Sequence, residues 1–157
     1  MAAPYKLDQI DLKILDSLQS DYTTPTKIIA QQLNIPESSC AKRVRLLKEN
    51  GYIQGVYARV NEKKLSSHIV VLIDVVLMHL TTDVYQQFSR EIIQHDCVRG
   101  CYMMTGKVDF TLRVVVSKIE DLTHFITKVL TPMPTVRNIR TKMIIDTIKD
   151  DHRLPLE

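Results

Sequence analysis

Apolar side chains recur every three or four positions in the first third of the chain, which is the spacing of an amphipathic helix. Three such segments follow one another, over residues 8–20, 25–33 and about 37–50. Between the last two, Asn34 can take the left-handed conformation that ends a helix, and Pro36 prevents its continuation. This order predicts a three-helix unit of the helix-turn-helix type, in which the second helix of the close pair enters the major groove.

Polar residues and a proline indicate where the first two helices begin. Asp8 is placed to cap the first helix, and Asp11 adds a negative charge near the positive end of its dipole. Thr24 is expected to cap the second helix, whose first residue is then Pro25. A proline is acceptable there because the first N–H groups of a helix have no partner within the helix.

The helical spacing of apolar residues ends after the third helix. Residues 52–60 mix apolar and polar side chains and suggest a strand, or wing, with Gly55 as a possible bulge. The polar segment 61–67 is the predicted linker. We therefore expect a DNA-binding domain over residues 1–60 and a second domain over residues 68–157.

The second domain contains strand and helix patterns in the order β-α-β-β-α-β. The strands are expected at 68–80, 98–105, 108–117 and 136–148, and the helices at 83–95 and 119–130. This order is the ferredoxin-like arrangement, so the fold class is α+β. The first strand is apolar on both faces apart from Asp74 and His79, whereas two helices cover only one face of such a sheet. We expect the open face to pack against another subunit.

The bulk composition narrows the class of protein without indicating a function. The chain has 157 residues, 45% of them hydrophobic and 25% charged, as in a globular protein. No apolar stretch is long enough to cross a bilayer, and the first residues lack a signal-peptide pattern. Three cysteines without disulfide spacing fit a reducing compartment. We therefore expect a cytoplasmic protein with no membrane partner.

Positive charge gathers on the third helix, although the net charge of +3 is too small to indicate nucleic-acid binding by itself. Taken alone, the helix fits an ordinary solvated face better than a DNA-binding one. Because it is the second helix of a close pair, however, the DNA-binding interpretation is favoured over the solvated face. The candidate contacts to base edges are Ser38, Ser39, Lys42 and Arg43, and the candidate contacts to phosphates are Arg45 and Lys48.

Three stretches of the sequence lie in an order and at a spacing that one protein family shares. They are L-D-Q-I-D-L-K-I-L-D-S-L-Q, S-S-C-A-K-R-V-R-L-L-K-E-N-G-Y-I-Q-G and T-G-K-V-D-F-T-L. Together they resemble the Lrp/AsnC family, the feast/famine transcription regulators of bacteria and archaea. The resemblance implies a sequence-specific regulator of double-stranded DNA that dimerises through its C-terminal sheets and often forms octamers. It also implies a small effector, commonly an amino acid, bound between C-terminal domains.

The resemblance further implies an effector site at the loop between the two middle strands. Many relatives carry G-D-x-D there, and this chain has Gly106-Lys107-Val108-Asp109, with a lysine in place of an acidic residue. Asp109 could pair with an ammonium group, and Gly106 would let the effector approach the backbone. The candidate effector-binding residues are Met104, Thr105, Gly106, Lys107 and Asp109.

Other chemistries have less support in the sequence. Cys97 and Cys101 with His95 lack a convincing fourth zinc ligand, so buried strand cysteines explain them better. Asp74 is expected to be solvated or paired at an interface, and residues 102–104 to lie in the core. No catalytic constellation is visible, so we expect no enzyme, no metal and no cofactor besides the possible amino-acid effector. The main alternative is a small-molecule-binding oligomer whose helical unit serves assembly.

Overall fold

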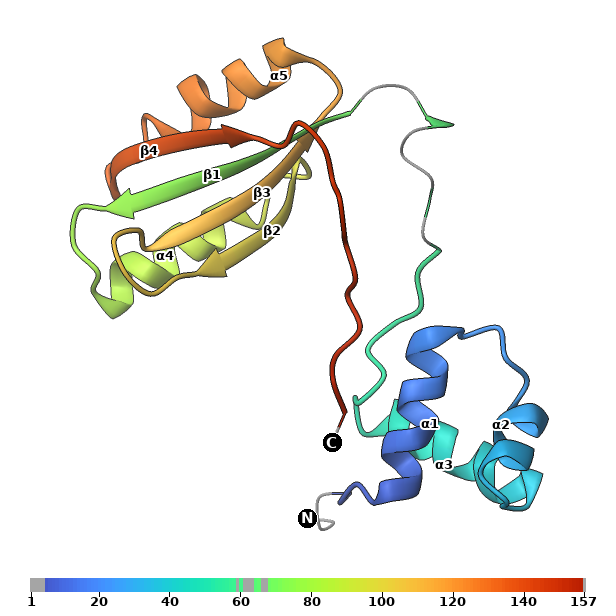
Figure 1. The fold of residues 1–157 in the computed structure, drawn as a ribbon. Helices are drawn as coiled ribbons and strands as arrows, with labels where there is room; N and C mark the ends of the chain where they lie inside the picture. Colours follow the sequence, from blue (N-terminus) through green and yellow to red (C-terminus); the bar gives the residue numbers. More distant parts are fainter. Residues whose placement is uncertain (1–4, 59, 61–63, 66–67, 157) are drawn as a thin grey trace. The chain divides into compact units, whose positions relative to one another are not determined.

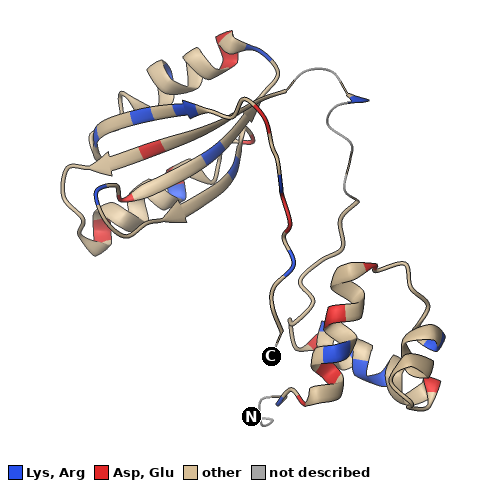
Figure 2. Cartoon of the chain, viewed as in Figure 1, with Lys and Arg blue, Asp and Glu red and all other residues tan. Residues whose placement is uncertain are grey.

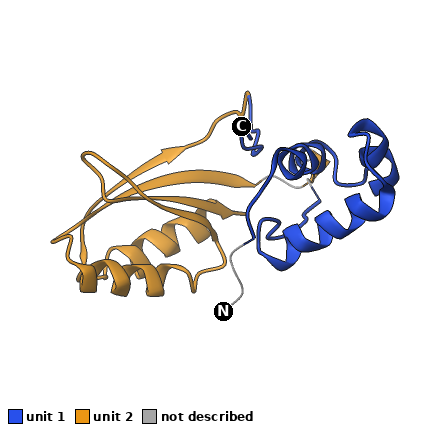
Figure 3. Cartoon of the chain, turned by 90° about the horizontal axis from the view of Figure 1, so that it is seen from below, with its two compact units in different colours: residues 1–59, 149–157 blue, residues 60–148 orange. Residues whose placement is uncertain are grey.

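The computed structural model describes residues 5–58, 60, 64–65 and 68–156 (Figure 1). The chain forms two compact units, one of residues 1–59 and 149–157, the other of residues 60–148 (Figure 3). This division lies near the predicted one, except that the C-terminal segment 149–157 belongs to the helical unit. Of the predicted linker, residues 61–63 and 66–67 lie outside the described residues.

Three helices form the first unit. They are α1 (Gln9–Ser20), α2 (Thr26–Gln32) and α3 (Glu37–Glu49). Their apolar faces meet in a core whose buried members are Ile14, Leu15, Ile29, Ala30, Cys40, Val44 and Leu47. The helical periodicity of the sequence thus identified all three helices, and the predicted helix-turn-helix is confirmed.

The ends of the helices follow the expected chemistry at some positions and differ at others. Asp8 caps α1 by accepting from the Asp11 N–H at 2.8 Å, and the Asp11 carboxylate accepts from the Asp8 N–H at 3.1 Å. Asn34 has a φ of 55°, as predicted for the residue that ends α2. The predicted cap of α2 is wrong, because Pro25 rather than Thr24 occupies the N-cap and no side chain caps this helix.

The strand expected over residues 52–60 does not form in the part of it that the structure describes. Residues 53–58 and 60 pair with no other strand, and Gly55 is therefore no bulge. A strand is stabilised by hydrogen bonds to a neighbour, and the described part of the helical unit contains no strand to supply them. The predicted strand is therefore wrong for the described residues, because alternating apolar residues alone do not form a strand.

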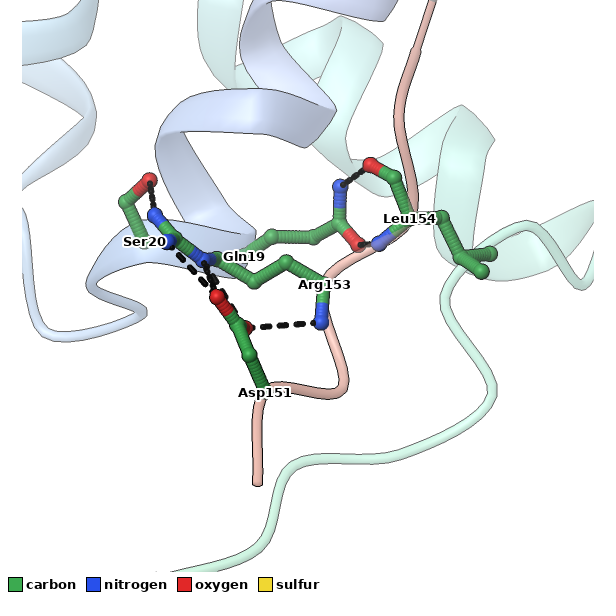
Figure 4. A network of polar contacts seen from close by, with 5 residues as sticks. All are labelled: Gln19, Ser20, Asp151, Arg153 and Leu154. Atoms are coloured by element: carbon green, nitrogen blue, oxygen red, sulfur yellow. Dashed lines mark hydrogen bonds and ion pairs between the residues drawn. The ribbon is translucent and has the colours of Figure 1, made fainter. Parts of the chain in front are cut away.

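The C-terminal segment packs on α1 (Figure 4). The side-chain amide of Gln19 accepts from the Leu154 N–H at 2.8 Å and donates to the Leu154 carbonyl at 3.2 Å. Leu156 packs against the helical core, and Arg153 forms an ion pair with Asp151 at 2.9 Å. The sequence contains no periodic pattern that predicts this return of the chain.

The second unit is a four-stranded antiparallel sheet with two helices. In spatial order β2-β3-β1-β4, its strands are β2 (Val98–Met103), β3 (Phe110–Val116), β1 (Ile69–Leu77) and β4 (Val136–Met143). The helices are α4 (Thr82–Ile92) and α5 (Ile119–His124), which continues as the π-helical segment η2 (Phe125–Leu130). Both helices lie on one face of the sheet (Figure 3). The predicted ferredoxin-like order is confirmed.

Side chains alternate across the central strand β1 and divide the sheet into two different faces. Val71, Ile73 and Val75 point toward the helices and are fully buried. Val70 and Leu72 point to the other face and are half-buried, because no helix covers that face. We call this second surface the open sheet face.

The last strand ends five positions earlier than predicted. Its final pair in the sheet is Met143 with Val71, followed by one hydrogen bond from the Ile144 N–H to the Val70 carbonyl at 2.9 Å. Beyond this point the chain leaves the sheet, and Ile145 and Ile148 are almost fully exposed. The apolar pattern extends further along the chain than the partner strand does.

We expect Gln19→Ala to loosen the C-terminal segment, because the substitution removes both side-chain hydrogen bonds to Leu154. Each such bond contributes about 0.5–1.5 kcal/mol. The segment should then be trimmed faster by a carboxypeptidase, as followed by mass spectrometry. Gln31→Ala is the control, since that side chain is exposed and has no hydrogen bond within the described residues. Equal trimming of the two variants would contradict this packing.

Candidate nucleic-acid interface and effector site

One face of α3 points away from the helical core. Ser38, Ala41, Lys42 and Arg45 are exposed and recur at intervals of three and four residues, so they share this face. Ser39 lies beside them and is half-buried. Figure 2 shows the basic residues of α3 in blue. The face combines hydroxyl groups and cations, which are the groups that contact base edges and phosphates.

Ala41 is a further member of this face. Cys40 and Val44 are buried on the inner side of the helix, but the side chain of Ala41 is exposed. Each residue turns the helix by about 100°, so the residue after a buried one lies near the boundary between the two faces. A small apolar side chain at that boundary is compatible with either side, and only the packing decides.

The two cations predicted to contact phosphates make weak contacts within the unit. The Arg45 Nε lies 3.6 Å from Glu49 Oε1 one turn later on the same helix. The ammonium of Lys48 lies 5.5 Å from the centre of the Tyr22 ring. Both side chains are exposed, and exposed pairs of this kind stabilise a protein by only about 0–1 kcal/mol. Neither contact is strong enough to hold these cations away from a phosphate.

Arg43 differs from the expectation that it faces base edges. Its Nη1 lies 2.7 Å from Asp8 Oδ2 and 2.8 Å from Asp11 Oδ1, and three quarters of its side chain is buried. The hydrogen bonds to Asp11 and Asp8, in that order, raise the pKa of the Arg43 guanidinium. The two carboxylates draw this side chain to the start of α1, beside the outward face of α3.

The Arg43 contact is part of a larger polar network within the helical unit. The Tyr5 hydroxyl donates to Asp11 Oδ2 at 3.0 Å, and the Tyr52 hydroxyl donates to the Tyr5 carbonyl at 2.8 Å. The Tyr5 and Tyr52 rings meet edge to face, with their centroids 6.2 Å apart. Asp11 therefore links three segments, and this linkage fixes the orientation of α3 relative to α1.

The predicted effector residues lie on the loop between β2 and β3. Hydrogen bonds at both ends hold this loop: the Met104 N–H donates to the Asp109 carbonyl at 2.9 Å, and the Asp109 N–H donates to the Val75 carbonyl at 3.0 Å. Asp109 Oδ2 also accepts from the Leu77 N–H at 2.7 Å. One carboxylate oxygen thus anchors the loop to β1, while Oδ1 has no hydrogen bond within the described residues.

The tip of this loop is exposed and depends on its glycine. Gly106 has a φ of 105°, a conformation that side chains rarely adopt, and Thr105 and Lys107 are exposed beside it. Two cavities of the second unit, one at the end of α4 and η2 and one at the start of β1, are lined by other residues. The five predicted effector residues therefore form an exposed edge of the unit and line neither of these cavities.

The residues that lead into this loop are not in the core. Tyr102, Met103 and Met104 are 53%, 59% and 44% exposed, so the expectation of core positions is wrong. Tyr102 and Met103 end β2, which is an edge strand of the sheet, and Met104 follows it. In a sequence, apolar residues of an edge strand cannot be distinguished from core residues, because the pattern does not show whether a strand has another strand on both sides.

Cys97 lies just before β2, and Cys101 lies within it. Cys97 and Cys101 are half-buried free thiols, and burial raises the pKa of each. The His95 ring packs edge-on against Phe125, with the centroids 5.5 Å apart. In the part of the chain that the structure describes, no three potential metal-ligating side chains lie together.

Asp74 is a buried and paired carboxylate on the open sheet face. Its Oδ2 lies 2.7 Å from the Lys142 ammonium, and its Oδ1 accepts from the Thr111 hydroxyl at 2.9 Å. The Lys142 contact, followed by the Thr111 hydrogen bond, lowers the pKa of Asp74. The carboxylate is thus fully engaged in the sheet, and its chemistry is structural.

Comparison with known proteins identifies the family. A family model described as the Lrp/AsnC ligand binding domain matches residues 70–154, which is more than half of the chain. The chain belongs to the Lrp/AsnC family. A second model, described as winged helix-turn-helix DNA-binding, matches residues 7–54. The protein is therefore an Lrp/AsnC-type transcriptional regulator with a DNA-binding helix-turn-helix and a ligand-binding domain.

Individual relatives agree with this assignment over nearly their whole length. The chain is 36% identical to the Bkd operon transcriptional regulator of Pseudomonas aeruginosa, over 91% of this chain and 94% of that protein. It is 26% identical to the leucine-responsive regulatory protein of Escherichia coli K12, over 96% and 92%. These relatives are named as regulators and not as enzymes.

Solved structures of the family have the same fold. An AsnC family transcriptional regulator from Agrobacterium tumefaciens aligns with a TM-score of 0.83 and 26% identity, over 96% of this chain and 97% of that one. The regulator NMB0573 from Neisseria meningitidis, solved as an L-Met complex, aligns with a TM-score of 0.84 and 22% identity, over 96% and 97%. Among the described residues, no helix is long and apolar enough to span a membrane.

We expect Asp11→Ala to destabilise the helical unit, because the Arg43 guanidinium and the Tyr5 hydroxyl would both lose a partner. The expected loss is about 2–3 kcal/mol in the free energy of unfolding, below the cost of breaking a fully buried pair because Arg43 keeps some solvent contact. Urea unfolding followed by far-UV circular dichroism measures it. Lys42→Ala, an exposed change on α3, should stay within about 0.5 kcal/mol. Similar losses for both variants would show that the Asp11 network has no special role.

Proposed function

We propose that the outward face of α3 is the part of this regulator that reads DNA. In this proposal Ser38, Ser39 and Lys42 contact base edges, and Arg45 and Lys48 contact phosphates. The observation that carries it is the exposed face of α3, on which Lys42 and Arg45 stand free of any strong partner among the described residues. Ala41 lies on the same exposed face, where its methyl group can contact the methyl group of a thymine.

Arg43 has a different role in this proposal. Its guanidinium is already held by Asp8 and Asp11, so a contact with a base would require breaking two charged hydrogen bonds. We infer that Arg43 is a positioning residue, which sets the angle at which α3 leaves the helical unit. Its removal would affect stability and DNA binding together, whereas Lys42 would affect DNA binding alone.

We infer that the protein is at least a dimer, formed through the open sheet face. Helices cover only the other face, and Val70, Leu72 and Val76 of the central strand β1 remain half-buried on the open one. A second copy would bury these side chains, and the Asp74 charge would already be balanced by Lys142. Two copies of α3 could then contact successive major grooves. Assembly of dimers into an octamer is a further part of the proposal, as is a cytoplasmic location beside the DNA.

We propose that an amino acid is the effector and that it binds at the loop of residues 104–109. Asp109 Oδ1 can accept from an ammonium group, and the exposed backbone at Gly106 permits close approach. The Neisseria relative solved with L-Met supports an effector of this class. Because the loop lies at an exposed edge, we infer that another subunit supplies the remaining walls of the site.

The DNA proposal is tested by Lys42→Ala and Arg45→Ala in fluorescence-anisotropy titrations of a fragment from the protein's own promoter. Lys42→Ala should reduce discrimination between that fragment and unrelated DNA by about 1–3 kcal/mol. Arg45→Ala should weaken binding to both and lower the salt slope by about 1. Lys128→Ala, an exposed change on η2, should leave both unchanged. If all three variants bind like the parent protein, α3 is not the reading element.

The effector proposal is tested by a thermal-shift panel of the twenty amino acids. A ligand at 100 times its Kd stabilises the folded protein by about 2.7 kcal/mol, which is readily measured. Asp109→Asn should abolish the shift while keeping the fold, because its amide oxygen can still accept from the Leu77 N–H. Asp121→Asn, an exposed change in the first turn of α5, is the matched control. An undiminished shift in Asp109→Asn would place the effector elsewhere.

A further inference from the structure

A cavity of about 300 Å³ opens on the second unit near the start of β1. Its lining residues are Val60, Leu65, His68, Arg99, Arg113 and Val115. None of them belongs to the loop of residues 104–109. Two guanidinium groups thus stand beside three aliphatic side chains and one imidazole, and none of the described residues in the lining is acidic. A cavity of this chemistry suits a ligand with one anionic end and one apolar end.

A β-bulge brings the two arginines together. The register of β2 against β3 shifts between Val98, which lies opposite Val114, and Gly100, which lies opposite Arg113. Arg99 is the extra residue of β2 at this shift, and a bulge of this kind redirects the side chain of the extra residue. Arg99 and Arg113 consequently line the same cavity, although they lie on different strands.

Neither arginine has a partner in the part of the chain that the structure describes. Among the described residues, neither Arg99 nor Arg113 forms a hydrogen bond or an ion pair. Arg113 is nevertheless half-buried, and a partly buried charge without a partner is unfavourable. Lys142 on the same face differs, because it is paired with Asp74 at 2.7 Å. The strands β2 and β3 therefore hold two guanidinium groups available for an anion.

Gly100 and Tyr102 add a hydroxyl group beside the arginines. A Cβ atom at Gly100 would lie 2.6 Å from the Tyr102 hydroxyl oxygen and 2.8 Å from the ring carbon that bears it. The Tyr102 ring therefore lies over Gly100, directly across the strand pair from Arg113. Such stacking shields the glycine backbone, and it also places a hydrogen-bond donor at the same end of β2 as the two guanidinium groups.

We propose that this cavity binds an aliphatic 2-oxo acid, separately from the amino-acid site at the effector loop. The carboxylate and the adjacent carbonyl present several oxygen acceptors on one edge, which suits the planar forks of Arg99 and Arg113. Val60, Leu65 and Val115 can receive the aliphatic chain. An amino acid fits less well, because its ammonium group would face two cations, and the described residues of the lining include no acidic partner for it.

The proposal is tested by isothermal titration calorimetry of the full-length protein with 4-methyl-2-oxopentanoate, leucine and inorganic phosphate. Arg99→Gln and Arg113→Gln should each weaken binding of the oxo acid at least tenfold, because a charged pair of hydrogen bonds is lost. Arg90→Gln, an exposed arginine on α4, is the control and should bind like the parent protein. Arg99 is itself exposed and without a described partner, so its replacement should leave the fold intact.

Three outcomes would overturn the proposal. They are no binding of the oxo acid, equal binding by the arginine variants and the parent protein, or tighter binding of phosphate than of the oxo acid. Asp109→Asn separates this proposal from the one for the effector loop. It should abolish the response to the amino acid and leave the oxo-acid titration unchanged.

Selective ¹⁵N-glycine labelling gives an independent readout, because the chain has only four glycines. The oxo acid should shift the amide signal of Gly100, next to Arg99, and the amino acid should shift that of Gly106. A shift of Gly106 alone on adding the oxo acid would assign it to the effector loop and overturn the separate site.

Discussion

The ion pair between Arg43 and Asp11 is the contact on which the helical unit depends. Asp11 is 1% exposed, and a carboxylate buried to that extent is tolerated only when its charge is compensated. Arg43, the Tyr5 hydroxyl and the Asp8 N–H supply the compensation. Because these groups come from α3, from the segment before α1 and from the cap of α1, the pair joins all three. The outward face of α3 thereby gains a fixed direction that apolar packing alone would not give it.

We propose two different ligand sites near opposite ends of β3 in the second unit. At one end, Asp109 anchors the exposed loop to β1 through the Leu77 N–H. At the other, the bulge at Arg99 sets two arginines beside an aliphatic cavity. Both places belong to the same pair of antiparallel strands. A ligand at either end would therefore act on one hairpin of the sheet through which we infer that the protein dimerises.

Local pattern predicted the elements well and their limits less well. Helical spacing identified α1, α2 and α3, and Asn34 ends α2 in the predicted left-handed conformation, because these features depend on neighbouring residues. The strands were overestimated where no partner exists. Residues 53–58 have no neighbouring strand in the described part of the helical unit, and the apolar residues after Met143 extend past the end of β1. Strand formation requires a second segment, which alternation in one segment cannot reveal.

The sequence by itself determined the order of the elements, the basic character of α3 and the position of the glycine loop at 106–109. Its three matching stretches were also sufficient to indicate the family. Only the tertiary structure decided that Arg43 turns to Asp8 and Asp11, that Asp109 anchors its loop, and that Gln19 holds the C-terminal segment. Each of these contacts joins residues far apart in the chain. Their geometry follows from how the helices and strands pack, and periodicity records only which side of each element is apolar.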